Sequence, residues 1–470
     1  MTIESGSFFD LPFSYLNRMK RILVILLVSV GYLASAQFEL QNIVCSEHLG
    51  NEEGKRAIQL NDGGWLWTGE VESLKMGLQV IVVRLDSVLN VLWSREYGGE
   101  DYEFAQDLFQ DDDNSLWMAG YTTSYGKGRR EYYILHLSER GDVLGEYTYG
   151  TAGDDAATFI RPFNKNLLIG GLSYGETGRD PQNYFLIIDR NGKVINEIIF
   201  GDRGAEALWD AVSLSDGSWL MTGQTTTTVN GEKDVYLVKM DDGGTVIWEK
   251  QFGDLGDDRS FRIKQWRDKF IIVGFSTSQS PGIRNGYVLC VDANGEKLWE
   301  TYLPYDRDLE LFGIEALPHR ILVTGYLFSS LTSEDMVVFE LSPSGDINDA
   351  YTLDANLNQR GRDIFVLDES VLVFGHKFGA NDDDLTFFDL SLRSLSVPSH
   401  QTTYSVWPNP TTGMLWIDGL EQEQWQLFNI AGDLILSGTK AVDISSAPIG
   451  VYILSVMSQG EIVNHKIYKY

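Results

Sequence analysis

The residues best suited to chemistry are acidic, and they lie in glycine-rich stretches that recur along the chain. Four such stretches are residues 98–101, 153–155, 201–204 and 253–258. Clustered carboxylates supply the hard oxygen ligands that Ca²⁺ prefers, so calcium binding is one function open to them. Their spacing fits no calcium-binding loop. We therefore expect turns whose acidic side chains stay solvated and cap strands, without a bound metal or other cofactor, and Ca²⁺ is the alternative.

A catalytic centre would need a nucleophile, a base and an orienting group that converge. One position, thirteen residues before a recurrent glycine, could bring side chains from several repeats to a common centre. Its residues are Arg56, Asp107, Thr158, Asp210, Phe261, Phe312 and Arg362. They are mixed in charge and size, and the chain has no Gly-x-Ser-x-Gly, His-Glu-x-x-His or phosphate-binding glycine loop. We therefore predict no catalytic, cofactor-binding or metal-binding residues.

The recurrent glycine reveals a repeat of about fifty residues. It closes an apolar run at intervals of 50 to 52 residues. The glycines are Gly69, Gly120, Gly171, Gly223, Gly274, Gly325 and Gly375. The three residues at two to four positions before each are apolar in every unit, as in a strand buried on both faces. A half-buried strand precedes each run and two further strands follow it, so each unit contains four antiparallel strands.

Four-stranded repeats of this length predict a β-propeller. We predict an all-β fold with a seven-bladed propeller over residues 37–396. The last unit has no fourth strand, whereas residues 38–49 end at Gly50, in phase with the glycines that end other fourth strands. The N-terminal strand is therefore expected to close the last blade. Closure of this kind removes an exposed sheet edge.

The N-terminus has the pattern of an export signal. Arg18, Lys20 and Arg21 precede an apolar run over residues 22–33, and Ala34-Ser35-Ala36 follows it. The run is too short to span a bilayer, which needs about 20 residues. We predict a signal peptide over residues 19–36, cleaved between Ala36 and Gln37, and no transmembrane segment in the mature chain. Residues 1–18 precede Met19 and are interpreted as a misassigned start.

The composition restricts the partners. Lys and Arg number 37 against 67 Asp and Glu, a formal net charge of −30. A chain this acidic lacks the basic patches that nucleic acids and anionic membranes require. We therefore expect no nucleic acid as a partner. Two cysteines cannot build a disulfide scaffold.

A second domain follows a polar linker at residues 397–403. Residues 404–470 alternate in hydrophobicity between turn signals and predict a small Ig-like β-sandwich. The motifs Pro408-Asn409-Pro410 with Gly413, Leu427-Phe428-Asn429-Ile430-Ala431-Gly432, Pro448-Ile449-Gly450-Val451-Tyr452 and Lys466-Ile467-Tyr468-Lys469-Tyr470 occur in order. This segment resembles the type A C-terminal sorting domain of the Bacteroidota type IX secretion system. The resemblance implies Pro408, Asn409, Pro410, Gly413, Gly432, Gly450, Tyr452 and Lys466 as sorting-motif residues.

The resemblance also implies recognition by the type IX secretion machinery and a secreted or outer-membrane cell-surface location. For the repeat region two functions stay open. The first is a non-enzymatic binding or scaffold protein with a glycan or protein ligand. The second is an extracellular enzyme, either a glycan-active lyase or hydrolase or a quinoprotein. The quinoprotein idea rests on residues 292–299, which resemble a quinoprotein propeller repeat, and on Trp93, Trp248 and Trp299 in one column of the repeat.

Overall fold

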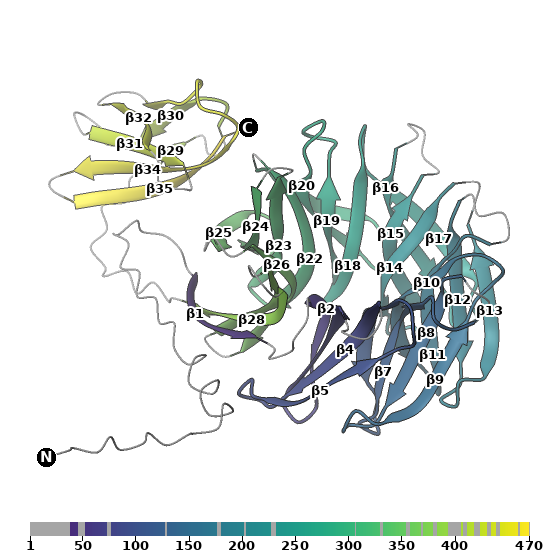
Figure 1. The fold of residues 1–470 in the computed structure, drawn as a ribbon. Coiled ribbons are helices and arrows are strands. Elements are labelled where there is room, and N and C mark those ends of the chain that lie inside the picture. The colour runs from purple at the N-terminus through teal and green to yellow at the C-terminus, as the bar shows by residue number, and fades with distance from the viewer. Residues whose placement is uncertain are drawn as a thin grey trace, which may run out of the picture.

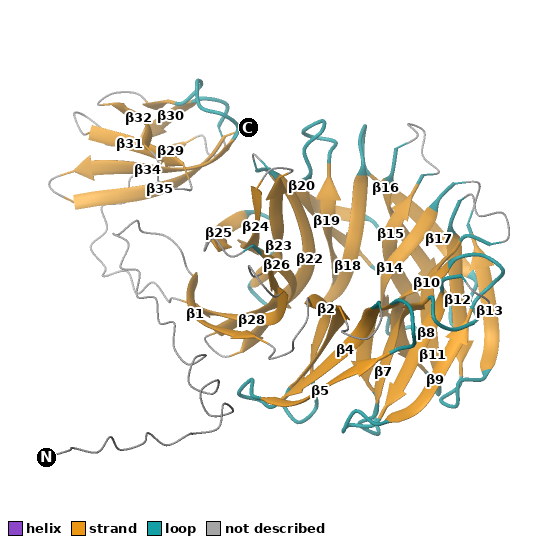
Figure 2. Ribbon diagram, viewed as in Figure 1, coloured by secondary structure: helices purple, strands orange, loops and turns teal. Residues whose placement is uncertain are grey.

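The structure is a computed structural model, and every regular element that it describes is a β-strand (Figure 1; Figure 2). The described residues are 38–45, 52–72, 77–126, 129–175, 180–201, 204–226, 232–305, 307–329, 332–353, 358–367, 370–378, 383–392, 406–407, 411–417, 424–429, 434–438, 442–458 and 461–469. The predicted all-β class is confirmed. Within these ranges no helix has the length and apolar character that a membrane crossing requires.

Consecutive groups of four strands form antiparallel sheets, as the repeat predicted. The first three sheets are β2 (Glu52–Gln59), β3 (Trp65–Glu72), β4 (Leu78–Leu85) and β5 (Val91–Tyr97); β6 (Glu103–Gln110), β7 (Leu116–Thr122), β8 (Glu131–Leu137) and β9 (Val143–Tyr149); and β10 (Asp155–Phe163), β11 (Asn166–Ser173), β12 (Gln182–Ile188) and β13 (Val194–Phe200). The next three are β14 (Glu206–Ser213), β15 (Trp219–Thr225), β16 (Asp234–Met240) and β17 (Val246–Phe252); β18 (Asp258–Trp266), β19 (Lys269–Ser276), β20 (Asn285–Asp292) and β21 (Lys297–Leu303); and β22 (Asp308–Leu317), β23 (Arg320–Ser329), β24 (Thr332–Leu341) and β25 (Ile347–Leu353).

The last sheet of the repeat region takes one strand from the other end of that region. It consists of β26 (Gln359–Leu367), β27 (Ser370–Phe378) and β28 (Asp383–Leu392), with β1 (Phe38–Cys45) at its outer edge. β1 runs antiparallel to β28, and Val44 lies opposite Phe387. Figure 1 shows this purple strand beside the green β28. The predicted pairing of the N-terminal strand with the last unit is confirmed.

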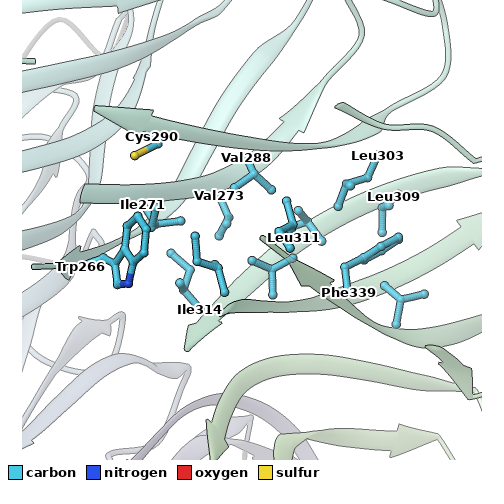
Figure 3. Close-up of a cluster of buried hydrophobic side chains, with 14 of the residues drawn as sticks. Trp266, Ile271, Val273, Val288, Cys290, Leu303, Leu309, Leu311, Ile314 and Phe339 are labelled. Carbon is cyan, nitrogen blue, oxygen red and sulfur yellow. The ribbon is translucent and has the colours of Figure 1, made fainter. Parts of the chain in front are cut away.

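Each sheet packs face to face on the next, so every sheet is covered on both faces. One apolar cluster lies between each successive pair of sheets. Figure 3 shows the cluster between β18–β21 and β22–β25, which extends from Trp266 past Leu311 to Phe339. A further cluster joins the last sheet to the first through Trp65, Trp67 and Phe387. The sheets therefore form a closed circuit, and the repeat region has a propeller-like fold.

A β-bulge interrupts the first strand of every one of these sheets. In β2, for example, Gly54 lies opposite Gly69 and Arg56 opposite Thr68, which leaves Lys55 without a partner in the ladder. The corresponding bulged residues of the other sheets are Gln106, Thr158, Trp209, Phe261, Phe312 and Arg362. A bulge bends the strand and redirects a side chain, so this position differs from the regular ladder around it.

The C-terminal region forms two sheets of its own. One contains β29 (Val406–Trp407), β30 (Met414–Ile417) and β33 (Val442–Asp443). The other has the order β32 (Leu434–Gly438), β31 (Gln424–Asn429), β34 (Gly450–Ser458), β35 (Glu461–Lys469). Leu415, Trp425, Leu427 and Ile467 are buried together in its core. Hydrophobic alternation is thus sufficient to give this short segment a core separate from that of the repeat.

Candidate functional site

The residues predicted to share a common centre do not occupy equivalent positions in the first strands of the repeat sheets. A fixed distance of thirteen residues before each glycine assumes one hairpin length, but the hairpin after the first strand of a sheet varies in length. Five residues separate Gln59 from its partner Trp65, whereas two separate Phe163 from Asn166. The residues thirteen positions before each glycine therefore include bulged residues in some sheets and the residues that directly follow the bulge in others. In register, the residues that directly follow the bulge are Arg56, Asp107, Phe159, Asp210, Arg262, Gly313 and Asp363.

Five of these residues, all except Phe159 and Gly313, join Arg161 of β10 in a cluster of ion pairs at the centre of the circuit. Arg56 lies 3.2 Å from Asp107 and 2.9 Å from Asp363. Arg161 bridges Asp107 and Asp210. Arg262 reaches Asp363 at 3.8 Å. The cluster thus links the first strands of all the repeat sheets except β22–β25, which has Gly313 at this position.

Each aspartate of the cluster also fastens its sheet to the following one. Asp107 accepts a hydrogen bond from the backbone N–H of Ile160 at 3.0 Å, and Asp210 accepts one from Ile263 at 3.1 Å. Asp363 accepts one from Ala57 at 2.9 Å, across the closure between the last sheet and the first. Burial opposes the ionisation of Asp210, but Arg161 and Arg262 outweigh it and hold its pKa below the usual value. The cluster therefore links neighbouring sheets through both ion pairs and backbone hydrogen bonds.

The acidic stretches between sheets contain both buried and exposed carboxylates. Asp155 and Asp258 are buried, contrary to the expectation that these acids stay solvated. Asp155 accepts a hydrogen bond from the backbone N–H of Thr151 at 2.6 Å, and Asp258 accepts one from Asp254 at 3.1 Å. They thus cap the turns between sheets from the interior. Among the described residues no group of three or more His, Cys, Asp or Glu side chains could hold a metal ion.

The tryptophans of the quinoprotein-like column serve packing between sheets. Trp93 contacts the turn glycine Gly141 of the next sheet, and Trp248 does the same at Gly295. Both glycines have positive φ, where a side chain would be strained and would also strike the indole ring. The column therefore has a structural explanation that needs no cofactor.

A cavity of about 440 Å³ opens beside β6, β10 and β14. The bulged residues Gln106, Thr158 and Trp209 line it, and Tyr121, Arg130 and Lys233 lie around them. Small side chains such as Ala157 and Ala207 leave the space open. Its volume falls within the range of small-molecule sites.

Two buried polar atoms of this cavity have no hydrogen-bond partner among the described residues. They are the indole Nε1 of Trp209, a donor, and Oε1 of Gln224, an acceptor. A buried polar group without a partner costs about 1–3 kcal/mol, so a ligand that supplies both missing partners would gain by binding in this cavity. Arg130 lies over the ring of Tyr121, with 5.6 Å between its guanidinium carbon and the ring centre, and 3.6 Å from Asp154.

A lysine and two glutamates lie in contact near the bulge of β2. Lys55 contacts Glu53 at 2.9 Å and Glu70 at 3.1 Å. Burial opposes ionisation of Glu53, but Lys55 and Arg362 outweigh it and hold its pKa at about 2. Burial raises the pKa of Glu70 to about 7, although Lys55 opposes the shift. The pKa values of two neighbouring carboxyl groups are thus shifted in opposite directions.

Neither the cavity nor the carboxyl pair was identified from the sequence. Gln106 and Trp209 occupy the bulged position of two different sheets, and Gln224 lies on the strand next to Trp209, so no contiguous motif unites them. The one available signal was the length of the hairpins, which fixes where each bulge falls. The pair of Glu53 and Glu70 spans the same hairpin but shares no spacing with known catalytic motifs.

The residues predicted for export and sorting are only partly placed. Ala36, Gln37, Pro408, Asn409, Pro410 and Gly432 lie outside the described residues. Gly413 lies against Ser445, and a side chain at this position would strike its hydroxyl. Gly450 begins β34, and Lys466 in β35 lies opposite Ile453. Tyr452 is buried and donates a hydrogen bond to the carbonyl of Pro448 at 2.7 Å.

Solved structures with related shapes share little sequence with this chain. The extracellular domain of a protein described as a hybrid two-component system from B. thetaiotaomicron is 10% identical, with a TM-score of 0.43. The match covers 92% of this chain and 60% of that one. The β-propeller domain of the Trilobed protease from Pyrococcus furiosus is 12% identical, with a TM-score of 0.38, over 77% of this chain and 94% of that one. The α-L-arabinofuranosidase Arb93A from Fusarium graminearum is 9% identical, with a TM-score of 0.40, over 61% and 92%.

A family model matches the end of the chain. No curated protein matches the sequence. Residues 405–469, however, match the model described as "Secretion system C-terminal sorting domain". This confirms the resemblance based on the motifs of residues 404–470. The chain therefore carries a type IX sorting domain, which implies interaction with that secretion machinery and a secreted or cell-surface location.

Proposed function

We propose that this protein is an exported, seven-bladed β-propeller that binds a glycan or protein ligand without transforming it. The observation that carries the proposal is the cavity beside β6, β10 and β14, with its unpartnered donor on Trp209 and acceptor on Gln224. Buried groups without partners suit a site that is completed by a ligand. The sorting domain supports a ligand that is met outside the cell.

The proposed domain organisation follows the sequence. A signal peptide occupies residues 19–36 after an upstream stretch of residues 1–18. The propeller occupies residues 37–396, a linker residues 397–403 and an Ig-like sorting domain residues 404–470. Pro408, Asn409 and Pro410 are proposed as part of the signal read by the secretion machinery of a Bacteroidota host.

An array of glycans and purified extracellular proteins, probed with the full chain, tests the binding proposal. Stable and saturable binding to one class, without change in the ligand, is the expected result. Turnover of a polysaccharide without stable binding would refute it.

One observation favours an enzyme as the second candidate. Carboxyl groups held in opposite protonation states at one pH are the pattern of an acid and base pair. Glu70, with a pKa of about 7, would be the acid, and Glu53, with a pKa of about 2, would be the ionised partner. A glycan-active hydrolase or lyase would then lose its turnover in Glu70→Gln, whereas a binding protein would show no turnover in either form.

A further inference from the structure

The cavity beside β6, β10 and β14 contains groups that narrow the ligand class. The inference rests on the proposed binding function and concerns the same site. Of the lining groups, Trp209 lies on the bulge of β14 and Gln224 lies on β15, the neighbouring strand. Trp209 is half-buried, so part of its indole ring can be contacted by a ligand.

The two unpartnered atoms require a ligand that both accepts and donates a hydrogen bond. An indole N–H can only donate, and a side-chain amide oxygen can only accept. A hydroxyl group is able to satisfy both at once, because it accepts through its lone pairs and donates through its proton. A carboxylate or phosphate could accept from Trp209 but would leave Gln224 unsatisfied and place two acceptors together.

The aromatic side chains require an apolar surface on the same ligand. Trp209 and Tyr121 both line the cavity, and the rings of Trp209 and Phe261 pack edge to face, with 6.5 Å between centres. A sugar ring combines an apolar face of C–H groups with hydroxyls at its edge. Aromatic rings with adjacent hydrogen-bonding groups are suited to both parts.

The charges around the cavity balance. Arg130 and Lys233 line it together with Asp180 and Glu206. Arg130 also faces Asp154 at 3.6 Å, so excess positive charge is small. A charged ligand would gain little from such a balanced lining.

We propose that this cavity binds a neutral sugar residue, with one hydroxyl placed between the indole N–H of Trp209 and the amide oxygen of Gln224. Specificity for hydroxyl-bearing ligands follows, because a deoxy analogue would leave both buried atoms unpaired. The cavity volume of about 440 Å³ is sufficient for a small ligand.

The test is titration of the full chain with a panel of neutral and acidic oligosaccharides by isothermal calorimetry. Trp209→Phe retains an aromatic ring but removes the donor, and Gln224→Leu removes the acceptor. Trp219→Phe is the matched control, since Trp219 also has a buried, unpartnered Nε1 but lies in the core outside the cavity. Thermal unfolding of each variant establishes that it is folded before binding is compared.

We expect a neutral oligosaccharide to bind, and each cavity variant to weaken binding about three- to tenfold, as for loss of one hydrogen bond. The Trp219→Phe control should bind as the parent chain does. Glycan binding that is unchanged in both cavity variants would overturn the assignment to this cavity while the proposed function stands. Binding of acidic glycans alone, or of a protein alone, would overturn the sugar class, and absence of any ligand would overturn the proposed function itself.

Discussion

Replacement of Asp107 by Asn tests whether the central ion pairs hold the circuit of sheets together. The carboxylate of Asp107 is fully buried and contacts both Arg56 and Arg161, and it accepts the N–H of Ile160. Asparagine keeps the size and can still accept from Ile160 through its amide oxygen, but the charge is lost and its amide N–H2 group faces the guanidinium of Arg56. Removing one partner of a buried pair costs about 3–5 kcal/mol, because the remaining charge stays buried.

The expected change in melting temperature follows from the size of the repeat region. Unfolding entropy is roughly 2.1 cal/mol/K per residue, or about 0.75 kcal/mol/K for the stretch between Phe38 and Leu392. A loss of about 3–5 kcal/mol therefore lowers the melting temperature by about 4–7 °C. Differential scanning calorimetry measures this shift directly.

The matched control is Asp142→Asn. Asp142 pairs with Arg95 at 2.8 Å, but both side chains are largely exposed. Such a surface pair contributes about 0–1 kcal/mol, so the control should shift the melting temperature by no more than about 1 °C. An equal and small shift in the two variants would show that the central cluster does not stabilise the fold as argued.

Three other predictions concern pH, the closing strand and export. The pKa of Glu70 is raised from 4.5 to about 7, so the folded state keeps this proton to higher pH than the unfolded state does, and stability falls as pH rises from 4.5 to 7. Relative to Glu70→Gln, the parent chain should lose at most about 3 kcal/mol of unfolding free energy across that window in denaturant titrations. Parallel pH profiles of the two proteins would contradict this prediction. Deletion of β1 uncovers the edge of β28, whose Phe387 and Phe388 are buried. The deleted protein should therefore be insoluble or strongly destabilised in solubility and melting assays. A soluble deletion variant with the melting temperature of the parent chain would contradict the pairing of β1 with β28. Deletion of residues 404–470 should leave the repeat region folded but retained in the periplasm in cell fractionation, and normal arrival at the surface would refute the sorting role.

The sequence was sufficient to predict the strands and their order. The recurrent glycines predicted which runs are buried on both faces. In β7, for example, Trp117 belongs to the apolar cluster shared with β10–β13, whereas the next residue, Met118, belongs to the cluster shared with β2–β5. Closure by β1 was predicted because a missing fourth strand in the last unit left only one partner for β28. These features depend on periodicity, which a single sequence displays.

The site could not be predicted because it depends on register. Hairpins of two lengths shift the first strand by one residue between repeats, and a shift of one residue exchanges the faces of a strand. Counting from the glycine therefore selected the bulged Phe261 in one sheet but Asp210, the residue after the bulge, in another. The ion-pair cluster and the cavity with Trp209 became evident only when the strands were paired.

Cross-linking of β1 to β28 tests the central claim, a closed circuit of sheets that holds the central cluster and the cavity in place. Cys45 lies directly opposite Thr386 in the register of the two strands, so Thr386→Cys places two cysteines across the closure. Side chains that are directly opposite in antiparallel strands lie about 4.5–5.5 Å apart at Cβ, near the spacing that a disulfide needs. Peptide mapping of the oxidised full chain by mass spectrometry should find residue 45 joined to residue 386 and a mass lower by two hydrogens. Free thiols at both positions, or a bond from residue 45 to Cys290 instead, would contradict the closed circuit.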